Sequence, residues 1–487
     1  MKKRNILIAI FIGTLALRLF LAFSIPNLTH DSYFHLRQVE QIKETGLPLY
    51  NDDLSYGGRE LLFLPGFHYL AAFLSFVIPL GILAKILPNL LLSFLPIIIY
   101  LISKQISKTP TAPLFSAFIA GLLPILYSTN SFSPFSLFLP LVFLAIYAFM
   151  NIKKNLYIYL ASFFLLSVTS SSTFLLIIGF GIYLLLSLME RKKIFLSEIE
   201  IILSSIFFFI WVQFLFFKDN FLENGISFIW QNIPAQIIQD YFPKVSIGEA
   251  ILLVSVIPFI TGVYVVYRSL FELKGSKLFL LISLTISTTI LTWFRIIQFR
   301  LSLAFFGLIL AILFASFLED AKKFFSQTKA SHLKKYASIA LIILLGLSMG
   351  YPAVLAAINQ ETPSNGEIEA FQWLKENTPK NSGVLSLLEE GHLIVYYGKR
   401  RNIMDDKFVL IEDSEQRFTD LSSLFRSSFE TLALEVLDKY KIKYLVLTTR
   451  AQEKYPEFKF LTKKCFKEIY NNQTRIYQVT CNLGISK

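Results

Sequence analysis

The sequence has 487 residues, of which 54% are hydrophobic and only 16% charged, and its mean hydropathy is +0.57. These values exclude a soluble protein, and apolar runs of about 20 residues, the length that crosses a bilayer as a helix, recur along the chain. The net charge of +12 lies mostly in residues 1–358, which hold 27 Lys and Arg against 16 Asp and Glu, whereas residues 359–487 hold 19 against 18. Since no soluble basic face with stacking aromatics is evident, nucleic acid is excluded as a partner.

The first apolar segment, residues 5–25, follows Met1-Lys2-Lys3-Arg4 as a signal sequence would. Arg18 lies inside it and no small-residue cleavage site follows, so we expect a retained first helix. Further apolar segments are found at residues 61–80, 84–103, 112–128, 134–150, 155–170, 173–190, 199–217, 250–268, 277–293, 298–317 and 337–358.

Loop charge decides which segments cross. With a cytoplasmic N-terminus and every segment crossing, the clusters Lys104/Lys108, Lys153/Lys154 and Arg191/Lys192/Lys193 would lie outside, against the positive-inside rule. Residues 61–80 contain Pro65-Gly66, which suits an interfacial or re-entrant helix that does not cross. The sequence then predicts about 11 transmembrane helices, with the N-terminus cytoplasmic and the C-terminal region outside the cell membrane.

Two external loops, residues 26–80 and 218–249, hold most of the acidic residues of the membrane part. The first contains the polar run Thr29-His30-Asp31-Ser32-Tyr33-Phe34-His35-Leu36-Arg37. Ionisable groups where a helix leaves the bilayer suggest a site for a headgroup, a phosphate or a metal. The alternative is an ordinary interfacial loop with solvated charges.

Arg295 and Arg300 lie at a predicted external turn between two spans. A guanidinium binds oxyanions with two parallel hydrogen bonds and does not deprotonate, so both residues are candidates for the phosphate of a lipid-linked substrate. The alternative is that each only extends to the phosphates of membrane lipids.

Residues 359–487 alternate as an external soluble α/β domain does. The pattern predicts helices at 367–377 and 428–440, strands at 384–388 and 444–448, and a hairpin of 466–470 with 475–480. Counting back from the hairpin turn places Cys465 opposite Thr480 or Cys481. The second register predicts a Cys465–Cys481 disulfide, and two free buried thiols are the alternative.

Three separated stretches are similar to the catalytic subunit of oligosaccharyltransferase in its single-subunit archaeal form. His30 to Arg37, followed later by Leu64-Pro65-Gly66-Phe67-His68-Tyr69-Leu70, resembles that family's first external loop. Ser246-Ile247-Gly248-Glu249 resembles the end of its long fifth external loop, and the run from Phe371 to Pro379 resembles the helix that enters the external domain. Arg300 stands in the place of an arginine in a late span, and the likeness extends over nearly the whole chain.

The resemblance implies a GT-C membrane glycosyltransferase with a divalent metal, Mn²⁺ or Mg²⁺, held by Asp31 and Glu249, which would be both metal ligands and catalytic residues. The candidates for binding substrate, from the residues and the resemblance together, are Tyr33, His35, Arg37, Arg295, Arg300 and Glu389. The acidic pair that the family has in its second external loop is missing, because residues 128–134 contain no carboxylate, and Asn130 is a substitute ligand at most.

The acceptor motif also departs from the family. Where the family has Trp-Trp-Asp-Tyr-Gly, this chain has Leu387-Leu388-Glu389-Glu390-Gly391. Glu389 could accept a hydrogen bond from an acceptor hydroxyl, and a strand end with two solvated acids is the alternative. Asparagine as the acceptor is therefore the part of the resemblance that this chain supports least.

The predicted architecture is a polytopic GT-C-like helical membrane domain, residues 1–358, followed by an external α/β domain, residues 359–487. The predicted function is transfer of a sugar or oligosaccharide from a polyprenyl-phosphate-linked donor to an acceptor on the outer face of the membrane. Protein asparagine, another residue of a protein or peptide, and a lipid are all open as the acceptor, and the expected partners are the lipid-linked donor, this acceptor and membrane lipids. The alternative is a degenerate relative that binds lipid-linked sugar as a non-catalytic scaffold. A transporter is disfavoured, because the carboxylates lie in external loops rather than at mid-membrane.

Overall fold

The computed structural model describes residues 3–192, 194–225, 245–271, 276–328, 334–408, 410–455, 459–462 and 464–481. The chain divides into two compact units. Residues 1–26, 64–219 and 245–360 form a helical unit, and residues 27–63, 220–244 and 361–487 form an α/β unit. Residues 27–63 of the predicted first loop thus belong with the C-terminal region. Most of the predicted second loop, including Asp240, lies outside the described residues.

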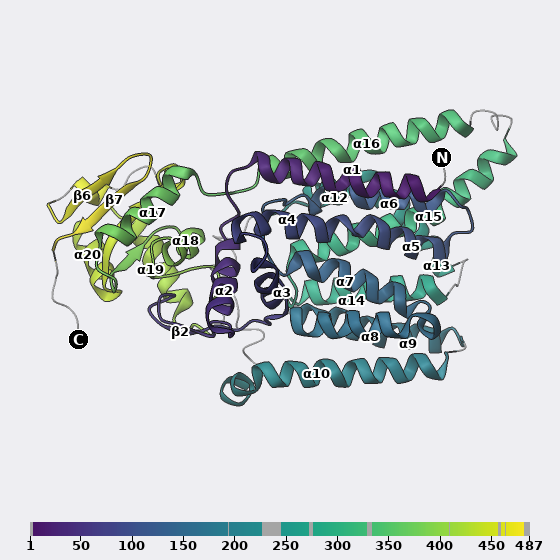
Figure 1. The fold of residues 1–487 in the computed structure, drawn as a ribbon, viewed down its shortest axis with the longest axis horizontal. Helices are drawn as coiled ribbons and strands as arrows, with labels where there is room; N and C mark the ends of the chain where they lie inside the picture. The colour runs from purple at the N-terminus through teal and green to yellow at the C-terminus, as the bar shows by residue number, and fades with distance from the viewer. Residues whose placement is uncertain are drawn as a thin grey trace. The chain divides into compact units, whose positions relative to one another are not determined.

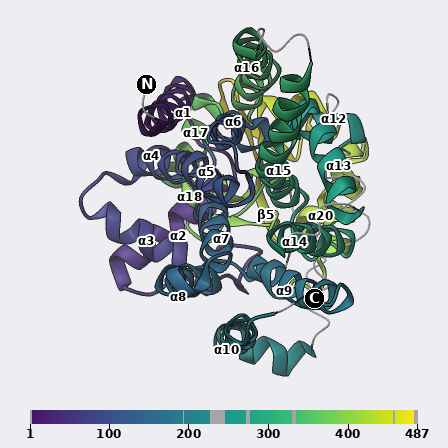
Figure 2. The ribbon, with the colours of Figure 1, turned by 90° about the vertical axis from the view of Figure 1, so that its right-hand side faces the viewer.

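Every apolar segment predicted from the sequence contains helix, and in the helical unit most of the long helices run side by side with nearly parallel axes (Figures 1 and 2). Its helices are α1 (Lys3–Ser24), α3 (Gly66–Ser75), α4 (Leu80–Ser93), α5 (Leu95–Ile106), α6 (Ala112–Gly121), α7 (Phe135–Phe149), α8 (Ile152–Thr169), α9 (Phe174–Met189), α10 (Leu196–Asn224, whose last turn joins the other unit), α12 (Ile247–Val254), α13 (Val256–Phe271), α14 (Ser276–Trp293), α15 (Phe299–Gln327) and α16 (Lys334–Ile358), with short 3-10 turns at Pro124–Leu126 and Ser171–Thr173.

The number of spans is smaller than predicted. Among the described residues six helices are long and apolar enough to cross a membrane, or up to seven if one bent pair counts as a single span. The chain is an integral membrane protein, but the count of eleven is not confirmed, because α6, α7 and α14 are shorter apolar helices and α8 is not among the candidate spans. The helix α3 has ten residues and is about 15 Å long, half the thickness of the hydrocarbon core, which agrees with a segment that does not cross.

The bent pair corrects one predicted span. Residues 250–268, expected as one continuous helix, are divided between α12 and α13, which meet at 92°. The break is at Ser255, whose φ of 76° lies in the left-handed region and ends the helical hydrogen bonding of α12. A serine can adopt this conformation at a local cost, and hydropathy carries no signal for it.

Arg18 is almost fully buried inside the helical unit rather than directed at lipid. Its Nη1 donates to the Leu126 carbonyl oxygen at 2.9 Å, and its guanidinium lies 5.1 Å from the centre of the Tyr127 ring. The Leu126 carbonyl is available because α6 ends at Gly121 and a short 3-10 turn follows it. The interrupted neighbour thus supplies one hydrogen bond and one aromatic face to a cation within the first helix.

The α/β unit is built around a five-stranded sheet of order β4-β3-β5-β7-β6. Strands β4, β3 and β5 are parallel, and β7 and β6 continue the sheet antiparallel. The elements of this unit are α2 (Ser32–Thr45), β1 (Asn51–Asp52), β2 (Arg59–Glu60), α17 (Asn365–Asn377), β3 (Gly383–Leu385), η5 (Leu388–Glu390), α18 (Gly391–Tyr396), β4 (Arg401–Asn402), α19 (Ser414–Arg426), α20 (Glu430–Lys439), β5 (Ile442–Leu447), α21 (Thr449–Lys454), η6 (Lys459–Thr462), β6 (Phe466–Asn471) and β7 (Arg475–Val479).

The predicted α/β elements are found, with one shortened. The strand expected at residues 384–388 ends at Leu385, because the 3-10 turn η5 follows almost at once and leads into α18. The short helix α18, the strand β4 and the helix α19 were not predicted. Tyr56, from the first loop, belongs to the same hydrophobic core as Leu385, Leu424 and Leu445, which unites residues 27–63 with the C-terminal region.

The predicted hairpin and disulfide are confirmed. Tyr470 pairs with Ile476, a register shift follows between Glu468 and Tyr470, and the Thr480 amide then donates to the Cys465 carbonyl oxygen. Cys465 and Cys481 are bonded, with their Cα atoms 5.0 Å apart. Beyond the shift the pairing is displaced by one residue, so Cys465 lies opposite Thr480. The bridge joins Cys465 to the next residue, Cys481.

Loss of this bridge should lower the free energy of unfolding of the α/β unit by about 3 kcal/mol, the chain-entropy value for a loop of about 15 residues. The two sulfurs close a loop of sequence separation 16. Amide hydrogen exchange in β6 and β7, compared between oxidised protein and a Cys465→Ser/Cys481→Ser variant in detergent, measures the change. Unaltered exchange in the variant would contradict a stabilising bridge.

Candidate functional site

Asp31 lies at the N-terminal end of α2, and its carboxylate is not used to cap the helix. Its Oδ1 accepts a hydrogen bond from Lys407 Nζ at 2.5 Å, and its Oδ2 lies 3.4 Å from His35 Nε2 one turn along the helix. The Asp31 side chain keeps 36% of its surface exposed. A carboxylate that is paired with a cation and still open to solvent can receive a substrate group.

Residues 402–407 approach Asp31 because Asp405, which is 1% exposed, fixes this segment to the first loop. Its carboxylate accepts hydrogen bonds from Ser55 Oγ at 2.7 Å, Asn402 Nδ2 at 2.9 Å and Arg59 Nη2 at 3.2 Å. The Lys407 amide also donates to Asp405 Oδ1 at 3.0 Å. A buried acid with all these donors is well satisfied, and it holds Lys407 in place.

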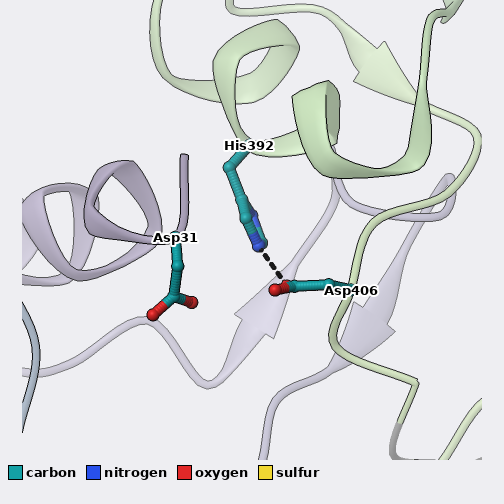
Figure 3. A group of neighbouring side chains, drawn as sticks. All are labelled: Asp31, His392 and Asp406. Atoms are coloured by element: carbon teal, nitrogen blue, oxygen red, sulfur yellow. Dashed lines mark hydrogen bonds and ion pairs between the residues drawn. The ribbon is translucent and has the colours of Figure 1, made fainter. Parts of the chain in front are cut away.

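His392 and Asp406 complete the cluster. His392 reaches from α18 toward Asp406, with Nε2 and Oδ1 2.7 Å apart, and Asp31 approaches from the start of α2 (Figure 3). Among the described residues Asp31, His392 and Asp406 form a group that could hold a metal ion, because one ligand atom from each lies within 4.8 Å of the others. We call these three residues with Lys407 the Asp31 cluster.

Opposite charges set the protonation of the cluster. Burial alone would raise the pKa of Asp31, but Lys407 and His35 hold this pKa well below its usual range. Burial would lower the pKa of Lys407, but Asp31 and Asp406 raise it above its ordinary value. Burial likewise opposes ionisation of Asp406, whose pKa is lowered by Lys407 and His392. Both carboxylates are therefore ionised and the ammonium is protonated at neutral pH.

The cluster contains ligands that a divalent metal accepts, but its arrangement suits an ammonium group. Lys407 Nζ is 2.5 Å from Asp31 Oδ1 and 3.7 Å from Asp406 Oδ1. A Mg²⁺ or Mn²⁺ ion shared by these two oxygens would lie in the same region, at about 2.0–2.2 Å from each, and would be repelled by the ammonium. With Lys407 in this position the residues present do not fit a divalent ion at Asp31.

The other predicted residues of the first loop make contacts within the α/β unit. Tyr33 is 2% exposed, and its ring lies 5.4 Å from that of Tyr396 and 5.2 Å from that of Tyr397. Arg37 forms a two-pronged ion pair with buried Asp52, with one Nη2–Oδ1 distance of 2.9 Å. These contacts position α2, and the predicted roles of Tyr33, His35 and Arg37 in binding substrate stay predictions.

Glu249 is exposed and belongs to the helical unit, at the start of α12. Its carboxylate accepts a hydrogen bond from the Ser246 amide at 2.8 Å, and Ser246 Oγ accepts one from the Glu249 amide, so that the two form a capping box. Asp31 belongs to the other unit, and a metal shared by Asp31 and Glu249 stays a prediction. Asn130, the substitute ligand, is buried and donates to the Ile25 carbonyl oxygen at 3.2 Å.

Arg295 lies in the turn between α14 and α15, Arg300 lies in the first turn of α15, and both are exposed. Arg295 has a φ of 58°, which turns the chain between the two helices. Within the described ranges neither guanidinium has an ion-pair partner, so both can bind an anion that is not part of the chain.

Replacing Arg300 with alanine should weaken binding of a polyprenyl phosphate by about 1.5–3 kcal/mol, the contribution of one charge-assisted contact. Lysine in its place should recover part of the loss, because it retains the charge but not the planar pair of donors. Tryptophan fluorescence titration with undecaprenyl phosphate in detergent measures the affinity. An unchanged affinity would return Arg300 to a contact with bulk lipid.

Glu389 and Glu390 are not solvated acids. Glu389, in η5, is 13% exposed, and its Oε1 lies 3.5 Å from Arg450 and 3.8 Å from Lys454. It lines a pocket of the α/β unit together with the aliphatic pair Leu387 and Leu388. Glu390 is fully buried behind it. Glu389 is thus placed to contact a bound group, and its role in substrate binding remains a prediction.

Sequence reasoning missed His392, Asp406 and Lys407 as members of this site. The available signal was the charged run Asp405-Asp406-Lys407 in the external domain, between predicted elements, with His392 directly after the recognised Leu387–Gly391 motif. Nothing local connects these residues with Asp31, since 375 positions separate Asp31 from Asp406.

No family model matches this chain, and no curated protein sequence does. Solved structures do match. An oligosaccharyltransferase AglB from Archaeoglobus fulgidus, determined with an inhibitory peptide and a dolichol-phosphate, aligns with a TM-score of 0.65 and 16% identity over 91% of this chain and 70% of that one. ArnT from Cupriavidus metallidurans aligns at 0.59 and 10% over 96% and 97%, and its complex with undecaprenyl phosphate at 0.57. The resemblance inferred from the motifs is confirmed in the fold, which this chain shares with both proteins.

Proposed function

We propose that this chain is a membrane glycosyltransferase that moves a sugar or oligosaccharide from a polyprenyl-phosphate-linked donor to a protein or peptide acceptor. The observation that carries the proposal is the Asp31 carboxylate, paired with a cation and partly exposed at the start of α2, where the sequence motif places the reacting carboxylate. The similar folds support the substrate classes. AglB was determined with an inhibitory peptide and a dolichol-phosphate, an Archaeoglobus fulgidus oligosaccharyltransferase with a tethered acceptor peptide, and ArnT with undecaprenyl phosphate.

In the proposed reaction an acceptor group attacks the anomeric carbon of the sugar in line with the departing carrier. A bond from that carbon to the acceptor forms, the bond to the carrier's phosphate oxygen breaks, and the acceptor proton ends on the released phosphate or on water. Asp31, with its lowered pKa, is a weak base, so its role is to orient the acceptor through a hydrogen bond. Arg300 and Arg295 neutralise charge on the carrier phosphate.

The sequence-based form of this proposal adds Mn²⁺ or Mg²⁺ held by Asp31 and Glu249. An AglB structure with zinc and sulfate is among the similar folds. Because the Lys407 ammonium group occupies the position beside Asp31 that a metal ion would need, no step of the reaction is assigned to a metal.

The test of function is a transfer assay on purified protein in detergent. The donor carries a labelled sugar linked to undecaprenyl phosphate or dolichol phosphate. We expect the label to appear on acceptor peptides that contain Asn-x-Thr or on proteins from the same membranes. Donor binding without transfer to any peptide or protein from the same membranes would overturn the proposal.

A non-catalytic lipid-linked-sugar scaffold is the second candidate. It is favoured by residues 128–134, which carry no carboxylate where the resembling family has an acidic pair. A scaffold binds polyprenyl phosphate as well as an enzyme does, so the assay separates the two by turnover rather than by affinity.

We further propose that the N-terminus is cytoplasmic and that the α/β unit lies outside. Because both native cysteines are bonded to each other, a single introduced thiol reports its own side. In intact cells a membrane-impermeant thiol reagent should label a cysteine introduced next to Lys454 and should leave one next to Lys323 unlabelled. The reverse pattern would invert the orientation, and the site with it.

A further inference from the structure

We propose that the ammonium group of Lys407 is the resident cation of the Asp31 cluster, so that it takes the place of a divalent metal and the reaction needs no added metal ion. The claim about the reaction rests on the proposed function, whereas the claim about metal binding does not.

The half-buried ammonium group is in contact with groups that stabilise a positive charge. Besides its contacts with Asp31 and Asp406, Nζ lies 5.5 Å from the centre of the Phe34 ring, at cation–π distance. Two carboxylates and an aromatic face thus form a site for one monovalent cation. The same two carboxylates with His392 offer three ligand atoms for a metal if that cation is removed.

Lys407 is also held by its backbone, so its position is part of the fold. Its amide donates to Asp405, and its carbonyl oxygen accepts a hydrogen bond from Arg59. Arg59 and Asp405 are 4% and 1% exposed at their side chains and form an ion pair at 3.2 Å. The base of the lysine side chain is therefore anchored on both sides by buried groups, and the ammonium reaches Asp31 from a fixed point.

Charge favours the ammonium over a metal in a second way. Asp31 uses both carboxylate oxygens, one toward Lys407 and one toward His35. A metal ion at Asp31 would have to displace Lys407, whose charge would then lie unpaired in a half-buried position beside the ion. Removing the lysine instead leaves two carboxylates with no ammonium between them, which creates affinity for a divalent cation.

The experiment measures Mn²⁺ binding by electron paramagnetic resonance on the full-length protein in detergent. Wild-type protein should show no bound Mn²⁺ at 100 µM. Lys407→Met should bind one ion, with an affinity for Mn²⁺ at least 10-fold higher than that of wild-type protein. That gained site should disappear in Lys407→Met/Asp406→Asn. Lys439→Met is the matched control. Lys439 pairs with Asp420 at 2.6 Å in the same unit, and among the described residues Asp420 belongs to no group that could hold a metal ion, so this variant should gain no site.

Two results would overturn the proposal. One is Mn²⁺ bound by wild-type protein and lost in Asp31→Asn, and the other is a folded Lys407→Met variant that gains no site. If Lys407→Met does not fold, the wild-type measurement and a Lys407→Arg variant still test the proposal. Lys407→Arg keeps the positive charge and should bind no Mn²⁺. Transfer activity should persist in EDTA, and activity that chelation abolishes and Mn²⁺ restores also contradicts the proposal. Absence of any transfer overturns the function alone, because the binding result stands without it.

Discussion

Replacing Asp31 with alanine should reduce glycosyl transfer by about 100- to 1,000-fold or more, the range for removing one preorganised group at a reacting centre. Asp31 is the member of its cluster that combines a sequence motif, a paired cation and an exposed carboxylate. The loss should appear in kcat, since an orienting hydrogen bond matters most in the transition state.

The protein should stay folded, because Lys407 retains Asp406 as a partner. Initial rates with a labelled polyprenyl-phosphate-linked donor measure the effect, and size-exclusion profiles confirm folding. Asp53→Ala is the matched control, since Asp53 is an exposed acid of the same loop. Asp52 would be a poor control, because it is buried and holds Arg37 together with the amides of Leu54 and Ser55. An Asp31→Ala variant with normal turnover would remove this residue from the mechanism.

Glu390 should contribute a fall of about 3 kcal/mol to the stability of the α/β unit as the pH rises from about 4.5 to above 7. Buried His30 of the same unit, whose pKa is lowered to about 4 by burial, contributes in the opposite direction below about pH 6.5, so the effect of Glu390 is measured as the difference between wild type and a Glu390 variant. Burial raises the pKa of Glu390 to about 7, against hydrogen bonds from Ser386 and Thr448. The folded state binds this proton more tightly than the unfolded state. The stabilising contribution is therefore complete below the unfolded pKa and is lost as the pH rises through the folded pKa.

Glu390→Gln should remove this decline and raise stability at pH 8, because the amide resembles the protonated acid. Its oxygen can still accept from the Leu387 amide, and the hydroxyl groups of Ser386 and Thr448 can rotate to suit it. Urea unfolding at a series of pH values measures the slope. The exposed Glu369→Gln in α17 is the control and should leave the slope unchanged. The same pH dependence in wild type and in Glu390→Gln would contradict the assignment to Glu390.

The position of Glu390 follows from the parallel part of the sheet. Ser386 comes directly after β3 and Thr448 directly after β5, and these strands are neighbours. Their carboxyl ends therefore bring the two hydroxyl groups together around one carboxyl. The motif that resembles an acceptor-binding loop, residues 387–391, starts from this buried support, which explains why Glu389 is held at the pocket wall rather than in solvent.

The sequence by itself determined the membrane class, a helix in every apolar segment and the α/β character of the C-terminal region, and it limited the residue opposite Cys465 to Thr480 or Cys481, with a bridge in the second case. These features depend on composition, on local periodicity and on one tight turn, all of which act over a few residues. It also singled out Asp31, because a motif of eight neighbouring residues is visible without knowledge of the fold.

Tertiary structure alone decided what surrounds Asp31. Lys407, Asp406 and His392 reach it because Asp405 bonds to Ser55 and Arg59 of the first loop, across more than 340 positions of sequence. It also decided that α12 and α13 bend by 92° at Ser255, and that Asp52 is a buried partner of Arg37 instead of an exposed acid. Each of these depends on which distant groups meet in space, and the free energy of such contacts has no signature in the neighbouring residues of the chain.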